Sequence, residues 1–497
     1  MRRVLQLLGL SGFLVTGFVS IPAIAQEATD TDAQQLAEEP KAEHPAPVAA
    51  AAAVVAPAAE AVAPVAKPKV GDMTTHGYFR GGLGANVAKK GRQSCFQLAL
   101  TGGLLAKYRL GNECEVWAEM EFTSVAYAGE DGSVARLHFM PVAFIPTTHI
   151  GYTPTGVTSS DQGSPGTGAT VAFPNLYVDM KGISWLFGGT AWVGTRYYKR
   201  ESVYINDFFY WNPSGVGAGV EDINLGGDLR LSYGVFAVDG QPNGSPQLPM
   251  QYGLGIRNDL QLRGIRPWES AELQFGFQYI ADWSGSKTEQ GDTVAPTHGG
   301  WGATAQFIQD ALGGTNKLAV QFGKGGGTGF GTLARFYYPD FSLQNDPAES
   351  RLRVVDVLTI QPTADLGAQL NVIFQRDNSG TGQSGAVTTW ISAGTRLSYA
   401  LADHAKLLGE VGYDRVKKSN GADLQWLAKF TIAPTIAGAK GFWGRPELRL
   451  FYTWAMWSQA AAGATVDSDK LYTYADPITG KYTLSGSIVG LQAEAMW

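Results

Sequence analysis

Residues 107–122, KYRLGNECEVWAEMEF, constrain the fold more than any other stretch, because their second half alternates between two kinds of side chain. A β-strand has a side-chain period of two, so alternate residues lie on opposite faces of the predicted strand. One face is apolar and the other carries an indole and carboxylates: Cys114, Val116, Ala118, Met120 and Phe122 alternate with Glu115, Trp117, Glu119 and Glu121. Such a strand suits the wall of a membrane pore, with lipid outside and water inside. Taken alone, it also fits an ordinary sandwich strand.

The composition excludes a helical membrane protein and permits a transmembrane barrel. After the N-terminal segment, the chain has no uncharged apolar run of the roughly 18 residues that a spanning helix needs. Barrel strands are only half apolar and therefore escape that requirement. The net charge of -6 also argues against a nucleic-acid partner, whose phosphates need a basic protein face.

Residues 1–25 have the features of a secretory signal peptide, with a positive start at Arg2 and Arg3, an apolar run, and a small-residue cleavage site that ends at Ala25. A single anchoring helix is the alternative. Export would place the two cysteines in an oxidising compartment, where a pair is bridged more often than free. Two thiols cannot form a structural zinc site on their own, and no metal or cofactor is predicted.

Residues 26–70 are predicted to form a periplasmic linker that is acidic at first and then rich in Ala, Val and Pro. Proline at this density prevents a long helix and favours an extended, hydrated chain. We interpret the segment as a spacer. A dedicated anchor that contacts the cell wall is the alternative.

Residues 71–497 have the pattern of an antiparallel barrel, in which short alternating segments are separated by turns rich in Gly, Asn, Asp and Ser. About 425 residues at roughly 23 per strand and connection give about eighteen transmembrane strands, although sixteen also fits. The last strand is apolar at alternate positions and ends on Trp497, and the first strand alternates around Tyr78. We expect these two strands to pair, because a barrel must leave no open edge in lipid.

Several strings resemble those of maltoporin and the related sucrose porins, which are carbohydrate-selective trimeric channels of Gram-negative outer membranes. The strings occur in family order: HGYFRGGLG at His76, CFQ at Cys95, KYRLGNECE at Lys107, FYWNPSGVGAGVEDI at Phe209, GYDRV at Gly412 and RPELRLF at Arg445. The resemblance spans the barrel and is weakest between residues 225 and 350. It implies an all-β transmembrane barrel of eighteen strands in outer-membrane lipid, with the third external loop folded inward to narrow the pore. It also implies a homotrimer and passive diffusion of sugars such as maltooligosaccharides.

The resemblance further implies the site residues. The aromatic lane along which sugars would slide consists of Tyr78, Trp117, Phe209 and Trp390. The polar lining of the constriction consists of Arg80, Arg109, Glu119, Arg200 and Asp207. Cys95 and Cys114 lie in strings that match the family's first external loop, which implies a disulfide between them.

The chain departs from the family pattern near the constriction. Phe209 occupies the place of a constriction tyrosine, so the ring is kept and its hydroxyl is lost. Ser202 and Asn212 replace acidic residues, and Met496 occupies the place of a lane tryptophan. We therefore expect a less acidic constriction and weaker sugar binding than in maltoporin.

Catalysis is a poorer fit to the sequence than transport. The six histidines lie beside no obvious nucleophile and carboxylate pair and lack metal-ligand spacing. The glycine run at residues 323–331 contains Lys324 but lacks the residue order of a phosphate-binding loop. The sequence thus predicts a sugar-selective porin that is not an enzyme, with a general diffusion porin or a barrel anchor for a periplasmic tether as alternatives.

Overall fold

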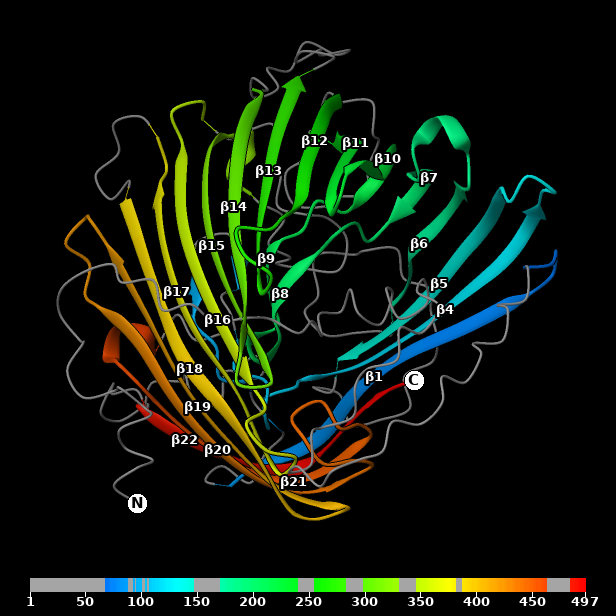
Figure 1. Cartoon of the computed structure of the whole chain (residues 1–497). Helices are drawn as coiled ribbons and strands as arrows, with labels where there is room; N and C mark the ends of the chain where they lie inside the picture. The colour runs from blue at the N-terminus through cyan, green and yellow to red at the C-terminus, as the bar shows by residue number, and fades with distance from the viewer. Residues whose placement is uncertain are drawn as a thin grey trace.

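A computed structural model describes residues 68–87, 93, 95–100, 103–104, 107–146, 170–239, 254–282, 298–329, 346–380, 387–462 and 483–497. Eighteen antiparallel strands form one closed ring (Figure 1). In ring order they are β1 (Met73–Asn86), β4 (Glu115–Ala128), β5 (Val134–Pro146), β6 (Thr170–Lys181), β7 (Thr190–Arg196), β10 (Gly215–Gly226), β11 (Leu229–Asp239), β12 (Leu254–Ile265), β13 (Ala271–Asp282), β14 (Gly300–Ala311), β15 (Gly314–Gly325), β16 (Ser350–Ile360), β17 (Leu366–Asn378), β18 (Val387–Ala402), β19 (Ala405–Lys418), β20 (Gln425–Ala437), β21 (Glu447–Trp457) and β22 (Ser485–Met496). The predicted barrel of about eighteen strands is confirmed.

The predicted signal peptide and all of the linker before residue 68 lie outside the described residues. Among the described residues, no helix is long and apolar enough to cross a membrane. The helical elements that are described are short 3-10 turns: η1 (Ser184–Leu186), η2 (Tyr204–Asn206), η3 (Gly326–Thr328) and η4 (Gln459–Ala461).

The ring closes where β1 pairs with the last strand, β22, on one side and with β4 on the other. Tyr78 lies opposite Met496 in the first pair and opposite Glu119 in the second. Two backbone hydrogen bonds between Gly77 and Trp497 continue the first pairing beyond the end of β22. A Cβ on Gly77 would overlap the Trp497 ring. The close approach of β1 to the last residue of the chain therefore depends on glycine at this position.

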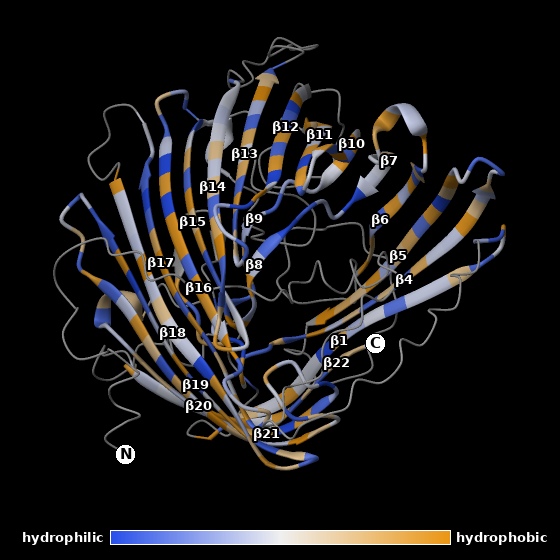
Figure 2. Ribbon diagram, in the orientation of Figure 1, coloured by the Kyte–Doolittle hydropathy of each residue, from blue (hydrophilic) through white to orange (hydrophobic). Residues whose placement is uncertain are grey.

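Hydropathy alternates along most strands, as bands of orange and blue in Figure 2 show. Along β4, the carboxylate-bearing residues Glu115, Glu119 and Glu121 are buried inside the ring, whereas Met120 is exposed on the outer face. The same alternation continues around the ring and gives the outer face a large set of exposed apolar side chains. The two faces of residues 115–122 therefore lie as their alternation predicted. Cys114, which was predicted on the apolar face, precedes β4 and is bridged to Cys95 within the first long connection.

The two ends of the barrel differ in the length of their connections. One end, here called the short-turn end, has tight turns such as residues 227–228 and 403–404. The other, the long-loop end, has connections such as residues 87–114 and 197–214. Both of these long connections enter the ring, and the small two-stranded pairings within them, β2 (Ala99–Leu100) with β3 (Gly103–Leu104) and β8 (Glu201–Val203) with β9 (Phe208–Trp211), do not join the wall. Figure 1 shows β8 and β9 inside the ring.

The first long connection is held to the wall by Tyr108. Its ring is almost fully buried against two glycines that face each other across β18 and β19, Gly394 and Gly412. A Cβ would lie 2.2 Å from the ring at Gly394 and 2.0 Å from it at Gly412, so only glycine leaves room. The Tyr108 hydroxyl lies 2.9 Å from the Oγ of Ser392. The wall thus contains a socket that fixes the position of the loop.

We predict that Gly412→Ala destabilises the barrel by about 1–3 kcal/mol, because the added methyl group displaces the Tyr108 ring. The measurement is the temperature at which the folded barrel loses its compact mobility on a gel. Gly409→Ala on the same strand is the matched control, because nothing lies within 4 Å of a Cβ at that position. Equal melting temperatures for the two variants would contradict the role of the socket.

Candidate functional site at the constriction

The constriction is built by a hairpin, residues 197–214, that folds into the lumen from the long-loop end. Strands β8 and β9 pair through Ser202 with Phe209 and Val203 with Phe208. Asp207 makes the turn between them with φ of 56°, in the left-handed region that aspartate tolerates better than most residues. This turn, which follows η2, directs the Asp207 carboxylate toward the wall strand β1.

The hairpin is fixed to the wall by polar contacts at its base. Glu201 accepts a hydrogen bond from Lys317 at 2.8 Å and lies 3.6 Å from the guanidinium of Arg263. The Tyr210 hydroxyl donates to Gln306 at 2.7 Å. Because these contacts come from β12, β14 and β15, the hairpin is tied to a broad arc of the ring.

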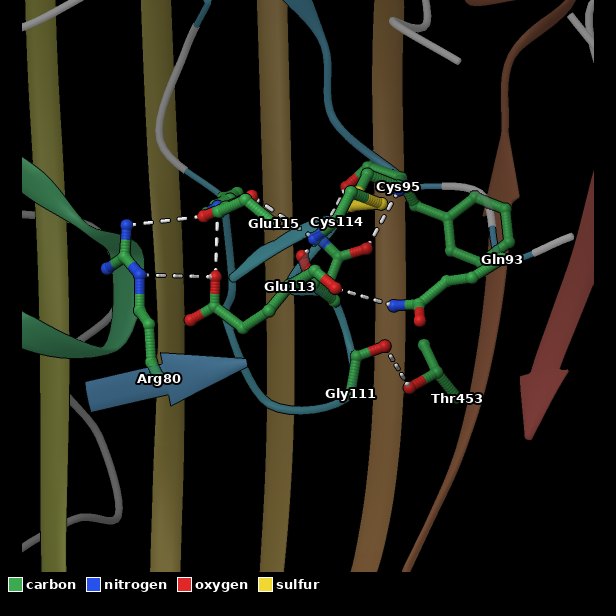
Figure 3. Close-up of a disulfide and its surroundings, with 11 residues drawn as sticks. Arg80, Gln93, Cys95, Gly111, Glu113, Cys114, Glu115 and Thr453 are labelled. Atoms are coloured by element: carbon green, nitrogen blue, oxygen red, sulfur yellow. Dashed lines mark hydrogen bonds and ion pairs between the residues drawn. A yellow bond between two sulfur atoms is a disulfide. The ribbon is translucent and has the colours of Figure 1, made fainter. Parts of the chain in front are cut away.

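A second inward segment, residues 107–114, lies against the tip of the hairpin and is here called the first-loop arm. Its backbone donates to the hairpin through Lys107 N–H to the Asn206 carbonyl and Arg109 N–H to the Ile205 carbonyl, at 3.0 Å and 2.9 Å. The arm ends at the disulfide between Cys95 and Cys114 that the resemblance implied. Figure 3 shows the disulfide next to the Glu113 and Glu115 carboxylates, which point toward Arg80.

Arg80 of β1 joins the wall to both inward segments. Its guanidinium donates two hydrogen bonds to the Asp207 carboxylate of the hairpin, at 2.9 Å and 2.8 Å, and a third to Glu115 of β4 at 3.2 Å. Such a two-pronged arrangement is the strong form of a charge-assisted hydrogen bond. The Arg80 Nε lies 3.9 Å from the carboxylate of Glu113 in the first-loop arm. Lys107 lies 2.5 Å from Glu115 and 3.0 Å from Glu113, which completes the contacts between arm and wall. We call the six residues of this network the eyelet cluster: Arg80, Lys107, Arg109, Glu113, Glu115 and Asp207.

The network continues from the eyelet cluster toward the short-turn end through Arg109. Its Nε lies 2.6 Å from Glu113, and its Nη2 donates to the Tyr78 hydroxyl and lies 3.2 Å from Glu494. The Tyr78 hydroxyl donates to Glu494 at 2.8 Å. The phenol of Tyr78 is therefore part of the charge network, and its ring is buried.

At the short-turn end, residues 438–446 fold inward and meet the tip of the hairpin. The Tyr204 ring lies edge-on to Trp443 at 4.9 Å, and its hydroxyl contacts both Arg445 and Glu494. Lys406 holds the turn in place by donating to the carbonyls of Gly441 and Gly444. The charged side chains in this region form ion pairs in which two carboxylates each contact more than one cation. The residues are Lys406, Arg445, Glu447, Arg449 and Glu494.

Among the predicted lane aromatics, Trp117 keeps an accessible surface. It is only partly buried, its indole Nε1 donates to Glu119 at 2.6 Å, and the Arg80 guanidinium lies 5.3 Å from its ring centroid. The Asp207 side chain is also partly accessible, at 19%. Trp117, Glu119, Arg80 and Asp207 thus form one neighbourhood around the eyelet.

Phe209 and Trp390, by contrast, are buried. Phe209 is covered by the guanidinium of Arg200, which lies 4.8 Å from its ring and also stacks on Tyr197. Trp390 is buried at 1% exposure, donates to Asp414 at 3.0 Å and contacts Phe208 edge-on. Trp390 of β18 therefore supports the hairpin from the wall.

A sequence model described as LamB porin matches residues 73–497, which is the whole described barrel. The chain belongs to the LamB porin family. It is an outer-membrane barrel, and in such barrels short turns face the periplasm and long loops face the outside. The constriction of this LamB porin is therefore formed by external loops, and the turn at residues 438–446 meets it from the periplasmic side.

The fold is also similar to solved structures of other outer-membrane proteins at low identity. OccAB1 from Acinetobacter baumannii is 12% identical over 87% of this chain and 98% of that chain, with a TM-score of 0.45. OpdK from Pseudomonas aeruginosa, solved with vanillate, is 11% identical over 86% and 99%, with a TM-score of 0.41. OmpF from Salmonella typhi, solved with daunomycin, is 9% identical over 86% and 98%, with a TM-score of 0.41.

Several residues of the network were not singled out as site residues from the sequence. Lys107 and Glu113 are in the string KYRLGNECE, and Arg445 and Glu447 are in RPELRLF, so the family strings contained the signal. Glu494 lies between two alanines of the last strand and in none of the family strings. Strand alternation assigns it to the inner face but gives no other sign of a role. Among the described residues, no group of three or more His, Cys, Asp or Glu is placed to hold a metal ion.

The two eyelet carboxylates outside the wall strands, Asp207 and Glu113, are held in their charged form by the surrounding cations. Burial alone would raise the pKa of Asp207, but Arg80, Arg109 and Lys107 outweigh it and hold the pKa below its ordinary value. Burial would likewise raise the pKa of Glu113, but Lys107, Arg109 and Arg80 hold it well below the ordinary range. Asp207 and Glu113 are therefore charged at neutral pH.

We predict that Asp207→Asn lowers the melting temperature of the barrel at pH 7, because it leaves Arg80 short of a partner at a cost of about 1–3 kcal/mol. A lowered folded-state pKa gives stability that is present above the ordinary carboxyl value, about 4, and is lost as pH falls through the lowered value. The difference between wild type and variant should therefore shrink on acidification below pH 4. The measurement is the melting temperature of both proteins between pH 7 and pH 2.

Asp423→Asn, in the exposed connection between β19 and β20, is the matched control for this comparison, because Asp423 makes no ion pair with a described residue. At pH 7 this control should have the same melting temperature as the wild type. A difference between wild type and Asp207→Asn that stays constant down to pH 2 would contradict the assignment of the Arg80 and Asp207 pair.

Proposed function

We propose that this LamB porin mediates passive diffusion of sugars, such as maltooligosaccharides, and that it does not catalyse a reaction. The observation that carries the proposal is the partly exposed Trp117 ring, held between Glu119 and Arg80 at the edge of the eyelet. A partly exposed indole in a wet lumen costs hydration free energy, and diffusion of ions and small solutes gives no reason for that cost.

The chemistry of a sugar ring matches this neighbourhood. A pyranose has an apolar face that can stack on the Trp117 indole and an equatorial rim of hydroxyl groups. Carboxylates such as Asp207 accept hydrogen bonds from hydroxyls, and guanidinium groups donate to them. The aromatic plane and the charged groups would therefore bind different parts of one sugar residue, weakly enough for release.

The departures from the family pattern favour weak binding. Phe209 has no hydroxyl to offer, and Arg200 covers its ring. Asn212 accepts from the Ser214 hydroxyl, so its side chain is used within the hairpin. With fewer free polar groups on the hairpin, Trp117 would supply a large share of the discrimination between sugars and other solutes.

The test is single-channel recording in planar bilayers with maltooligosaccharides added in turn. We predict that sugars block the current of the wild-type channel and that Trp117→Ala lowers their apparent affinity about fivefold, through loss of roughly 1 kcal/mol of stacking. Open-pore conductance should stay level or rise, because the lumen loses bulk and no charge. Trp117→Phe should restore part of the affinity.

Trp268→Ala is the control for removal of an indole, because Trp268 lies on the turn at residues 266–270 and contacts Phe307 of the outer face. It should leave sugar block unchanged. If no oligosaccharide blocks the wild-type channel, a general diffusion porin becomes the better assignment.

We also propose that the protein is a homotrimer. Strand β7 has seven residues, fewer than the roughly 9–11 that a strand needs to cross a bilayer. The barrel wall is therefore shorter along the membrane normal in this sector. Next to it, Phe122, Phe139 and Phe173 stack across β4, β5 and β6 on the outer face. A neighbouring copy would cover both features. A detergent-corrected mass of three chains is expected, and a monomer would contradict the proposal.

A further inference from the structure

In the ring strands that the structure describes, exposed cations on the outer face occur in one sector. Of the Lys and Arg residues in the ring strands that the structure describes, four are exposed: Lys324, Arg376, Arg415 and Lys417. They belong to β15, β17 and β19, which lie in the same arc of the ring. All four lie near the external ends of their strands, where they are close to the headgroups of the external leaflet. Charges that serve only solubility would be expected all around the barrel and at both of its ends. The grouping of these four cations therefore calls for another explanation.

Three of these cations surround the external end of β18. Strand pairing places Arg376 and Lys417 on either side of Thr389, in one row across three strands. Arg415 lies beside Ile391 in the next row toward the periplasm. Neighbouring strands are about 5 Å apart, so the Cα atoms of Arg376 and Lys417 are separated by about 10 Å. Their long side chains can therefore reach one group placed over Thr389.

The surface between the cations is hollow. Thr389, Ile391, Arg415 and Lys417 line a groove of about 210 Å³. The groove has a cationic rim, a hydroxyl and an apolar floor, which suits a ligand that joins an anionic head to a hydrocarbon.

Below the groove, β18 offers a shallow path along the outer face toward the bilayer centre. Ala393, the next outward residue, lies between Val372 of β17 and Tyr413 of β19, both of which are exposed. A small side chain between two larger ones leaves a channel along the strand, which an acyl chain can occupy. The apolar flanks continue one row further with Leu370 and Val411.

No described carboxylate neutralises the cations of the groove. Arg376 and Arg415 form no ion pair with any described residue, and Lys417 donates to the backbone carbonyl of Ala422 at 2.6 Å. Asp377, the neighbour of Arg376 in the chain, is paired with Arg351. Uncompensated cations beside an apolar surface are costly in lipid unless an anion accompanies them.

We propose that this groove binds a phosphorylated lipid of the external leaflet, with its phosphate held by Arg376, Arg415 and Lys417 and one acyl chain along β18. Charge-assisted hydrogen bonds from guanidinium forks give phosphate its preferred partners, and Thr389 adds a hydroxyl. Basic pockets on membrane proteins recognise lipid headgroups by the same combination of charge and apolar contact. The proposal depends on the outer-membrane barrel and not on the transported solute.

The test is native mass spectrometry of the purified full-length protein in detergent. The probe is a bis-phosphorylated, acylated disaccharide lipid, and the comparison probes are the same lipid without phosphates and inorganic phosphate alone. We expect the phosphorylated lipid to bind wild type, with affinity lowered about tenfold in Arg415→Gln and further in Arg376→Gln/Arg415→Gln/Lys417→Gln. Lys324→Gln is the matched control, because it removes one exposed cation at the same end and outside the groove. It should bind the lipid within about twofold of wild type.

Three results would overturn the proposal. Equal losses in Arg415→Gln and Lys324→Gln would show general attraction to a basic surface. Equal binding of the lipid without phosphates would show that hydrocarbon contact suffices. Binding of inorganic phosphate at the same concentration as the phosphorylated lipid would show that the groove is a site for a free anion. Lys417→Gln provides an independent variant, and single-channel conductance reports whether each variant retains its barrel.

Discussion

The hydrogen-bond closure of the ring is the constraint on which the other features depend. In lipid no water can satisfy a free strand edge, so β1 must pair with both β4 and β22. A closed ring of eighteen strands is too wide to be filled by its own wall side chains, as the wider porin barrels show. Any narrowing of the pore then has to come from chain that enters the lumen. The hairpin at residues 197–214 and the first-loop arm supply that chain.

Loops placed inside a barrel need fixed positions, and this protein fixes them with buried pairs of opposite charge. Arg80 of β1 contacts Asp207 of the hairpin and Glu113 of the first-loop arm. Glu494 of β22 contacts Arg109, Arg445 and the Tyr204 hydroxyl. Burying ions carries a desolvation cost, so such pairs add less stability than their Coulomb attraction suggests. Their larger effect is on geometry, because a misplaced loop would leave charges without partners. We infer that the network sets the shape of the constriction more than it stabilises the barrel.

The sequence predicted the wall well because strand alternation is a local property. The faces of Glu115, Trp117 and Glu119 follow from a period of two, and each further strand can be assigned in the same way. The contacts of the inward segments could not be predicted, because they join distant residues. Tyr204 and Glu494 are separated by 290 positions, and nothing near either residue indicates the other. Trp390 shows the same limit. Its alternation places it on the inner face, but its burial beneath Phe208 depends on how the hairpin folds.

Because alternation assigns each strand residue to a face, a residue that does not suit its face is informative. An outward position in a barrel strand is expected to be apolar, so Arg415 and Lys417 on β19 contradict the rule that assigns the rest of that strand. A wall needs no cation there, and a charge in contact with lipid is costly unless it is partnered. Inside the ring, where polar side chains are expected, Trp117 is the opposite exception, because it places a partly exposed apolar ring on the inner face. Each exception has a cost that the barrel alone does not explain. A solute for Trp117 and a lipid phosphate for Arg415 would offset those costs, so the two faces of one wall would each carry a separate binding function.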